Sequence, residues 1–281
     1  MGNKAPKKES ASLRFLYQTA LGRLLLKPLV SPCISKLAGA FMSSPLSRPL
    51  IGRFVKKNGI CLSDYEDARY RSFNDCFTRR IRAEKRPIPM EKEAFIAPCD
   101  ALLSAYPIKK DSVFRVKGSD YSVKGLLGGD ETLAKKYEGG TALVFRLCVH
   151  HYHRYIYLDG GKKGDNVFIE GKLHTVRPIA LESFPVFVQN AREYTVMETE
   201  NFGTVTQIEV GALLVGKIKN NHREHTFTRG EEKGMFLYGG STIIVLTEKD
   251  AVLFDGRFFA ATEENEEIEV RMGDTLGTRP A

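Results

Sequence analysis

The sequence predicts an α+β protein: a basic, mainly helical region over residues 1–90, followed by an antiparallel β-rich domain over residues 91–281. Two observations support this division. Apolar residues recur at helical spacing from about residue 12, and "KRPIP" at residues 85–89 then interrupts the pattern. Beyond Pro89, short runs rich in Val, Ile, Phe and Thr alternate with turns that contain Gly and Asp, which is typical of antiparallel sheets.

The first expected helix, residues 12–30, is both apolar and basic. Its apolar positions follow the i, i+3, i+4 spacing of one helical face: Leu13, Leu16, Tyr17, Ala20, Leu21 and Leu24. The uncharged stretch from Phe15 to Gly22 is far shorter than the roughly 20 residues that span a bilayer, so we expect no transmembrane helix. We also expect no signal peptide. A helix of this kind is typical of a segment lying on a membrane surface, but packing on the protein's own core explains the pattern equally well.

The positive charge is concentrated at the N-terminus. Of the 42 Lys and Arg residues, 11 fall within residues 1–60, beside a single acidic residue, Glu9. Such a segment favours a polyanionic partner, either nucleic acid or an anionic membrane. The accompanying leucine-rich helix favours the membrane, and we expect no nucleic-acid partner. The five cysteines are widely spaced and contain no C-x-x-C pair, which favours reduced thiols in the cytosol over a zinc site or disulfides.

The remaining elements follow from local patterns. A second helix is expected to begin at Ser63, a plausible N-cap in "SDYEDARYRSFNDCFTRRIR". Strands are expected within the β-rich runs 95–108, 142–149, 166–176, 184–190, 194–218, 242–247, 251–256 and 267–273.

Three of the six histidines lie in "CVHHYHRYIYLDGG", directly after the apolar run "ALVFRL". If that strand continues, His151 and His153 share one face and His150 lies on the other. A metal site is a weak reading, because no acidic or Cys partner stands at a familiar spacing, and we expect none. General acid–base chemistry fits better, since the pKa of histidine lies near neutrality. Ordinary polar residues at a strand end are the alternative.

Two further residues complete a candidate constellation. Asp100 lies inside the apolar segment "APCDALLS", either exposed at a strand end or buried where it orients a partner. Ser241 follows Gly239 and Gly240 in "FLYGGSTIIVL", which is either a plain turn or a place where the chain itself reacts. Asp, His and Ser together suggest a triad in which the carboxylate orients the imidazole that activates the serine. There is no G-x-S-x-G motif, so an α/β-hydrolase is not expected.

From about Leu13 to the C-terminus the sequence resembles the phosphatidylserine decarboxylase family, pyruvoyl-dependent enzymes of phospholipid synthesis. The segments that carry the resemblance occur in the family's order: "SFNDCFTRRIRAEKRPI", "APCDALLS", "VKGSDYSVKGLLG", "FRLCVHHYHRYIYLDGG", "GKLHTV", "IEVGALLVGKI" and "KGMFLYGGSTIIV". Several motifs in the right order are far more specific than any one of them.

The resemblance implies a self-processing carboxy-lyase. Ser241 would attack the carbonyl of Gly240 and split the chain into a β chain, 1–240, and an α chain, 241–281, that stay together. Ser241 would become the pyruvoyl cofactor, and a Schiff base with it would convert phosphatidylserine into phosphatidylethanolamine and CO2. Asp100 would orient the activating histidine, and His153 of Tyr152-His153-Arg154 would reprotonate the product. The implied location is peripheral, on the cytoplasmic face of an anionic phospholipid membrane, and a homodimer is left open.

One departure from the family's pattern concerns the base. Many members have a second histidine at the position of Ile156, where it activates the serine. Here His153 does both jobs, or His150 or His151 substitutes, or the chain no longer cleaves; we favour His153. A non-catalytic lipid-binding paralogue and a decarboxylase of another serine-headed lipid, such as archaetidylserine, are the alternative functions. His174, His222 and His225 are interpreted as structural or surface residues, and Arg154, Lys117 and Lys124 as weak candidates for the lipid phosphate.

Overall fold

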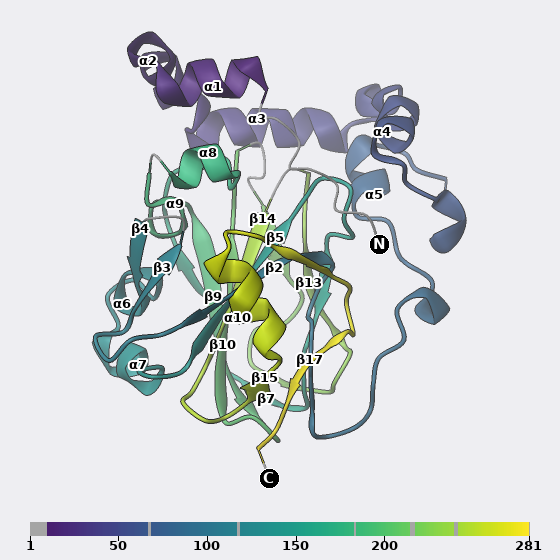
Figure 1. Cartoon of the computed structure of the whole chain (residues 1–281). Helices are drawn as coiled ribbons and strands as arrows, with labels where there is room; N and C mark the ends of the chain where they lie inside the picture. Colours follow the sequence, from purple (N-terminus) through teal and green to yellow (C-terminus); the bar gives the residue numbers. More distant parts are fainter. Residues whose placement is uncertain are drawn as a thin grey trace.

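The computed structural model describes residues 10–66, 69–116, 119–182, 184–213, 217–238 and 241–280 (Figure 1). Within them the chain forms helices and antiparallel sheets, so the expected α+β class is confirmed. Gly240, on the amino side of the expected cleavage point, lies outside the described residues, as do Lys117 and Lys4, Lys7 and Lys8 of the basic segment. The division into two domains at residue 90 stays a prediction.

Helices occupy the N-terminal part of the chain, and Figure 1 shows α1 to α3 together at one end of the sheets. The α-helices are α1 (Ala11–Gln18), α2 (Ala20–Leu29), α3 (Pro32–Ser43), α4 (Leu50–Asn58) and α5 (Phe73–Phe77), with 3-10 turns η1 (Pro45–Ser47), η2 (Leu62–Asp64) and η3 (Ala83–Lys85). Backbone and side-chain bonds attach α1 and α2 to the rest: Thr175 N donates to Tyr17 Oη at 3.1 Å, and Leu173 N to Val30 O at 3.0 Å.

Two expectations for this region are wrong. The helix predicted over residues 12–30 is broken at Thr19, whose backbone is extended and whose Oγ1 caps α2 by accepting from Gly22 N at 3.0 Å. Ser63 does not begin a helix either. It lies in η2, and the N-cap of α5 is Ser72, whose hydroxyl accepts from Asp75 N. In both cases several Ser and Thr residues could cap the helix, and the local sequence does not show which of them does.

The strands of the main sheet differ in length, and all of its described pairs are antiparallel. Its order is β12 (His225–Phe227), β7 (Gly161–Lys163), β9 (Arg192–Thr199), β10 (Thr204–Val210), β14 (Ser241–Thr247), β5 (Thr141–Leu147), β2 (Ala101–Pro107) and β16 (Ile268–Val270), with β8 (Val167–Ile169) beside β9. Strand β14 lies between β10 and β5, and all seven of its residues are buried.

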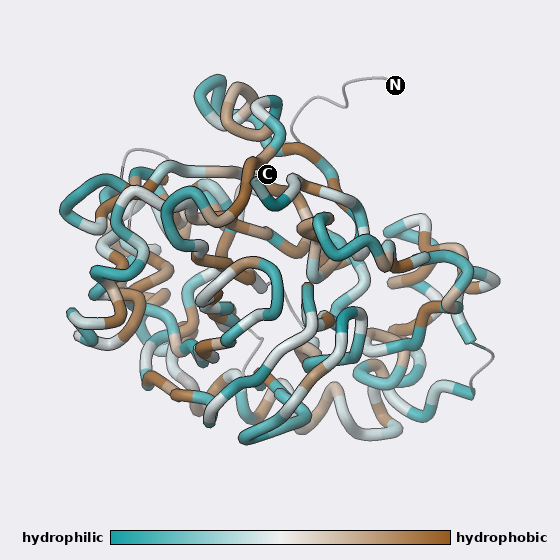
Figure 2. The backbone as a smooth tube through the Cα atoms, turned by 90° about the horizontal axis from the view of Figure 1, so that it is seen from below, coloured by the Kyte–Doolittle hydropathy of each residue, from teal (hydrophilic) through white to brown (hydrophobic). Residues whose placement is uncertain are grey.

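Smaller sheets and helices complete the fold. The additional sheets are β11 (Ile218–Asn220), β13 (Glu232–Phe236) and β6 (Arg154–Ile156); β1 (Ala94–Ile96), β17 (Thr275–Thr278) and β15 (Leu253–Phe254); and β3 (Val113–Val116) with β4 (Ser119–Ser122). The later helices are α6 (Val123–Leu126), α7 (Glu131–Lys136), α8 (Pro178–Leu181), α9 (Val186–Gln189) and α10 (Gly256–Glu263). The tube in Figure 2 changes between hydrophilic and hydrophobic colours over short stretches, as expected where each element turns one face to the core.

The expected strand at residues 184–190 is wrong, because Val186–Gln189 forms the short helix α9. Pro185 precedes that helix and has no N–H to contribute to a strand ladder. The helical turn still buries Val186 and Phe187, so the apolar character that suggested a strand is used in the core. Of the run 166–176, only Val167–Ile169 forms a strand.

A fully buried ion pair joins the main sheet to the β11-β13-β6 sheet. Lys233 Nζ on β13 lies 2.8 Å from Glu209 Oε1 on β10, and neither side chain is exposed. Asn220 on β11 donates to Glu209 and accepts from Lys233, and Gln207 also donates to Glu209. These bonds offset the cost of removing both charges from water.

Removing one charge of this pair should therefore destabilise the protein strongly. We expect Lys233→Met to lower the free energy of unfolding by about 3–5 kcal/mol, because it leaves Glu209 buried without a counter-charge. Urea denaturation measures the change. The double variant Glu209→Leu/Lys233→Met should recover part of the loss, and a single variant no less stable than the double would contradict this account.

Candidate active site

Ser241 occupies the first position of the central strand. Its Cα lies opposite that of Leu147 on β5, and the residue is completely buried. Its Oγ has no hydrogen-bond partner among the described residues, which leave out Gly239 and Gly240 immediately before it. A buried hydroxyl without a partner costs about 1–3 kcal/mol. Such a cost in the middle of a sheet points to a functional reason for the serine.

The histidine cluster is formed by a turn, not by a continuing strand. Strand β5 ends at Leu147, His151 N donates to Cys148 O at 2.9 Å, and β6 begins at Arg154. The condition on which His151 and His153 would share one face of a strand is therefore not met. In the turn, His151 and His153 are buried whereas His150 is exposed.

The hydrogen bonds of the two buried rings assign them different tautomers. His151 Nδ1 accepts from Cys148 N–H at 3.0 Å, so the hydrogen of the neutral ring is on Nε2. His153 Nδ1 lies 2.9 Å from the carbonyl oxygen of His151, which can only accept. His153 therefore carries its hydrogen on Nδ1, and the lone pair of its Nε2 is free. That Nε2 is buried and has no hydrogen-bond partner in the described part of the chain, as expected of a poised base.

Burial keeps both rings neutral. It lowers the pKa of His153 well below the usual histidine value, and the neighbouring His151 lowers it further. Burial, followed by the proximity of His150, lowers the pKa of His151 to about 3, whereas Asp100 acts in the opposite direction. Of the two neutral rings, His153 is the one with a free lone pair, on Nε2, that can accept a proton.

Strand β13 ends beside His153, five residues before Ser241. Phe236 N donates to His153 O at 2.9 Å, and Ser241 enters the main sheet five residues later, opposite the residue where β5 ends. The same chain segment therefore starts beside His153 and ends at Ser241.

Helix α5 packs against His153 and against the segment that precedes Ser241. The Phe77 ring lies 4.0 Å from that of His153 and 5.4 Å from that of Tyr238, and Tyr238 N donates to Asn74 Oδ1 at 2.9 Å. Sequence reasoning gave these residues no role, although "SFNDCF" belongs to a segment that carried the resemblance. Because Asn74 holds the backbone two residues before Gly240, α5 positions the loop that would be cleaved.

Asp100 is buried, so it is not an exposed residue at a strand end. It does not orient His153, however. Its carboxylate accepts from Arg86 Nε at 2.8 Å, from Arg86 Nη2 at 2.5 Å and from Met272 N at 2.9 Å. The expected hydrogen bond to the histidine is therefore wrong for this structure, because the His151 carbonyl orients that ring and Arg86 engages both carboxylate oxygens. A catalytic role for Asp100 stays a prediction.

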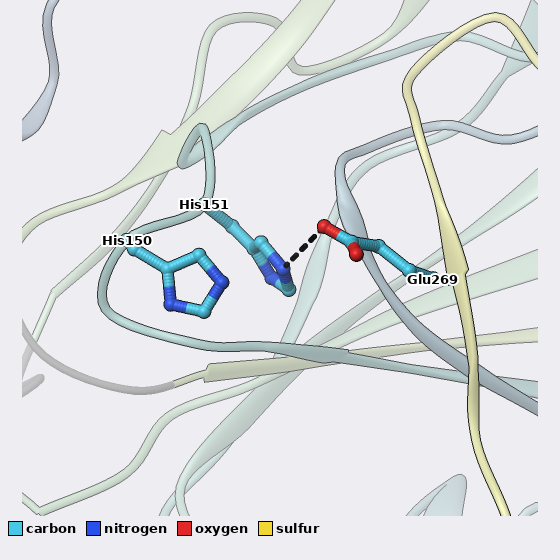
Figure 3. Close-up of side chains that lie close together, drawn as sticks. All are labelled: His150, His151 and Glu269. Carbon is cyan, nitrogen blue, oxygen red and sulfur yellow. Dashed lines mark ion pairs between the residues drawn. The ribbon is translucent and has the colours of Figure 1, made fainter. Parts of the chain in front are cut away.

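The carboxylate that faces His151 is Glu269, as Figure 3 shows. His151 Nε2 lies 4.0 Å from Glu269 Oε1, and the exposed His150 lies beside them. Glu269 reaches this place because β16 pairs with β2, which sets Glu269 opposite Leu102. No local pattern could have indicated it, since the contact depends on strands about 165 residues apart in the sequence.

Comparison with known proteins identifies the family. The sequence profile described as "Phosphatidylserine decarboxylase" matches residues 73–278. The chain belongs to the phosphatidylserine decarboxylase family. It is 43% identical over 270 residues to phosphatidylserine decarboxylase proenzyme 2 of Clostridium acetobutylicum, covering 96% of this chain and 92% of that protein.

Two other relatives in the phosphatidylserine decarboxylase family are named proenzymes. That of Ruminiclostridium cellulolyticum is 38% identical over 271 residues, 94% of this chain and 90% of its own length. That of Clostridium botulinum strain 657 is 37% identical over 273 residues, 95% of this chain and 92% of its own length. The resemblance stated from the motifs is thereby confirmed at the level of the family.

Ile156, where many phosphatidylserine decarboxylases have a second histidine, is buried in β6 opposite Glu232. It is part of the core and cannot transfer a proton. The candidate phosphate ligands are also engaged: Arg154 Nη1 lies 2.7 Å from Glu232, and Lys124 Nζ lies 2.9 Å from Glu131. Neither is a preformed phosphate site, and Lys117 lies outside the described residues.

Proposed function

We propose that this chain is a phosphatidylserine decarboxylase that makes its own pyruvoyl group by cleaving itself between Gly240 and Ser241. It would convert phosphatidylserine into phosphatidylethanolamine and CO2. The observations that support this most directly are a buried, unpartnered serine hydroxyl at the start of the central strand and a buried histidine with a free Nε2, whose carbonyl oxygen binds the backbone of Phe236 five residues before that serine. Membership of the family, whose relatives are named proenzymes, supplies the reaction class.

Cleavage is a proton transfer followed by an acyl shift. His153 Nε2 takes the proton of Ser241 Oγ as the oxygen adds to the Gly240 carbonyl carbon. The bond from that carbon to the Ser241 nitrogen breaks, and the nitrogen takes the proton, which leaves an ester. Loss of the Ser241 Cα proton expels the Gly240 carboxylate, and water converts the resulting dehydroalanine into a pyruvoyl group and ammonia.

The residues around His153 suit the chemistry of the group that Ser241 would become. A pyruvoyl group supplies a ketone that condenses with the substrate amine and accepts the electron pair when CO2 leaves. The carbonyl of His151 keeps the His153 ring in place, so that Nε2 could take a proton from the ammonium group of the substrate and pass it to the carbon that has lost CO2. Phe77 packs against this fully buried ring on one side and against Tyr238 on the other, which limits the access of water.

The two fragments would stay together without a covalent link. Segment 241–281 begins with β14, which is paired with β10 on one side and β5 on the other. It also supplies β16 to β2 and β17 to β1. Separating the fragments would expose the fully buried strand β14, so we propose a stable two-chain enzyme.

The split itself can be followed by intact mass. We expect the purified protein to consist of segments 1–240 and 241–281, the latter blocked by pyruvoyl, and Ser241→Ala to remain a single 31.5 kDa chain. His153→Gln should slow splitting by about 100-fold or more, since a positioned base contributes 10²–10⁴-fold. His150→Gln, at an exposed histidine, is the control.

A wild-type chain that stays whole and releases no CO2 from phosphatidylserine would contradict the proposal. It would favour the non-catalytic lipid-binding alternative, for which the buried Ile156 is the motivating observation. Normal splitting in His153→Gln together with arrested splitting in His151→Gln would move the base to His151.

We further propose that the N-terminal region attaches the enzyme peripherally to the cytoplasmic face of an anionic membrane. Large apolar side chains are exposed on or between helices α1 to α4: Phe15, Leu21, Leu24, Leu25, Leu37, Phe41, Leu46 and Leu50. Within residues 10–30, only Tyr17, Leu26 and Val30 belong to the buried core. Exposed Arg23, Lys27 and Lys36 lie among the apolar residues, which suits an anionic interface.

No single helix in the described residues is long and apolar enough to cross a bilayer. The helices Ala20–Leu29 and Cys33–Ser43, which are bent by 61° relative to each other, reach the length and apolar composition of a membrane span only when the two are taken together.

Membrane attachment predicts a specific effect of removing apolar side chains. Leu21→Ser/Leu24→Ser/Leu37→Ser should weaken sedimentation with phosphatidylserine-containing vesicles at least tenfold, because each inserted leucine contributes about 1.5–3 kcal/mol. Leu253→Ser, equally exposed but on β15, should bind like the wild type. Binding should also fall with salt. Equal binding to neutral vesicles at every salt concentration would contradict the proposal.

A further inference from the structure

A second group of potential metal ligands lies apart from the candidate active site. His222 follows β11, His225 begins β12, and Glu231 precedes β13. One ligand atom from each lies within 4.8 Å of the others. The group therefore sits where the chain leaves the β11-β13-β6 sheet, pairs with β7 at the edge of the main sheet, and returns. The sequence indicated only structural or surface histidines here, because nothing local singled out Glu231.

The separations fit a small divalent ion. His225 Nε2 lies 2.7 Å and His222 Nε2 lies 3.7 Å from the same oxygen, Glu231 Oε1. Tetrahedral zinc with bonds of about 2.0–2.1 Å holds its ligand atoms about 3.3 Å apart. The two measured separations lie on either side of that value. The imidazole rings are stacked at 3.9 Å and 16°, so binding requires them to tilt toward a common point.

Surrounding groups already direct the correct atoms toward that point. The Tyr157 hydroxyl lies 3.2 Å from His222 Nδ1, which leaves Nε2 for an ion. Glu231 Oε2 accepts from Thr228 N at 3.0 Å, which leaves Oε1. Lys163 Nζ bonds the carbonyl oxygens of His222 and Arg223 and fixes the backbone between the two histidines. Partners of this kind orient metal ligands and raise affinity.

We propose that His222, His225 and Glu231 bind one divalent transition-metal ion of the zinc class through Nε2, Nε2 and Oε1. Each side chain is about 30% exposed, which gives the ion access from solvent and leaves room for a water molecule as the fourth ligand. Imidazole with one carboxylate suits zinc, copper and nickel better than magnesium or calcium. The ion stabilises the segment that passes from β11 to β12 and back to β13, between the two sheets. It takes no part in the chemistry at Ser241.

The other histidine–carboxylate group provides a comparison within the same chain. His150, His151 and Glu269 also lie close enough to share an ion, but the Glu269 side chain is 70% exposed and His151 Nε2 lies 4.0 Å from it (Figure 3). This carboxylate is far more exposed than Glu231, so it is less well fixed for binding an ion. We therefore expect the group at His222 to bind the ion more tightly.

Zinc titration of the full chain after chelator treatment tests the proposal. Calorimetry should show one tight zinc site in the wild type, and Co2+ should give visible absorption bands of a tetrahedral ion. His222→Ala and His225→Ala should lose the tight site. Tyr157→Phe should weaken it about 10–100-fold, the usual effect of losing an orienting partner. The matched control His150→Ala should keep it unchanged.

Absence of saturable zinc binding in the wild type would overturn the proposal, as would an unchanged tight site in His225→Ala or its loss in His150→Ala. X-ray absorption of the zinc-loaded wild type tests the ligand types without any variant, and His150→Ala then distinguishes the two histidine–carboxylate groups, which share those ligand types. We expect two imidazole ligands with the rest oxygen. A sulfur ligand would place the ion at a cysteine and overturn the assignment.

Discussion

Everything at the candidate active site depends on the central position of strand β14. Its ladders to β10 and β5 bury all seven residues, beginning with Ser241 itself. A serine in that position cannot be solvated, and its hydroxyl must react, find a partner in the preceding loop, or remain unsatisfied. The same ladders explain how an enzyme could cut its own chain before this strand and still hold the pieces together. In the proposed self-cleavage, sheet pairing would thus connect stability with the generation of the cofactor.

The second constraint is the arrangement of buried polar groups around that strand. The carbonyl oxygen of His151, and not a carboxylate, accepts the hydrogen on Nδ1 of His153. The orientation of the His153 ring, and with it the free Nε2, therefore requires no buried negative charge. Asp100 is instead neutralised by Arg86. Without a hydrogen-bonded carboxylate, desolvation sets the pKa of His153 and keeps the ring neutral and able to act as a base. The buried Ile156 is compatible with a single histidine, His153, serving both the proposed self-cleavage and the decarboxylation.

The sequence predicted the fold class, strands within residues 95–108, 142–149 and 242–247, and the family, because long apolar runs and ordered motifs are local signals. It did not predict the break at Thr19 or helix α9, where capping and core packing decide between similar local choices. Ser241 and His153 could be chosen from motifs, but Glu269 opposite Leu102 and Tyr238 against Phe77 required the long-range register of the folded chain. For Asp100 the sequence left an exposed and a buried position open, and its partner Arg86 gave no recognisable signal.

The central claim is that His153 is a neutral base with its hydrogen on Nδ1 before the chain is cut. Nitrogen NMR of the histidine side chains in the uncleaved Ser241→Ala protein at neutral pH measures this directly. The account predicts a hydrogen on Nδ1 of His153 and on Nε2 of His151, with both rings uncharged. A doubly protonated His153, or a hydrogen on its Nε2, would contradict it.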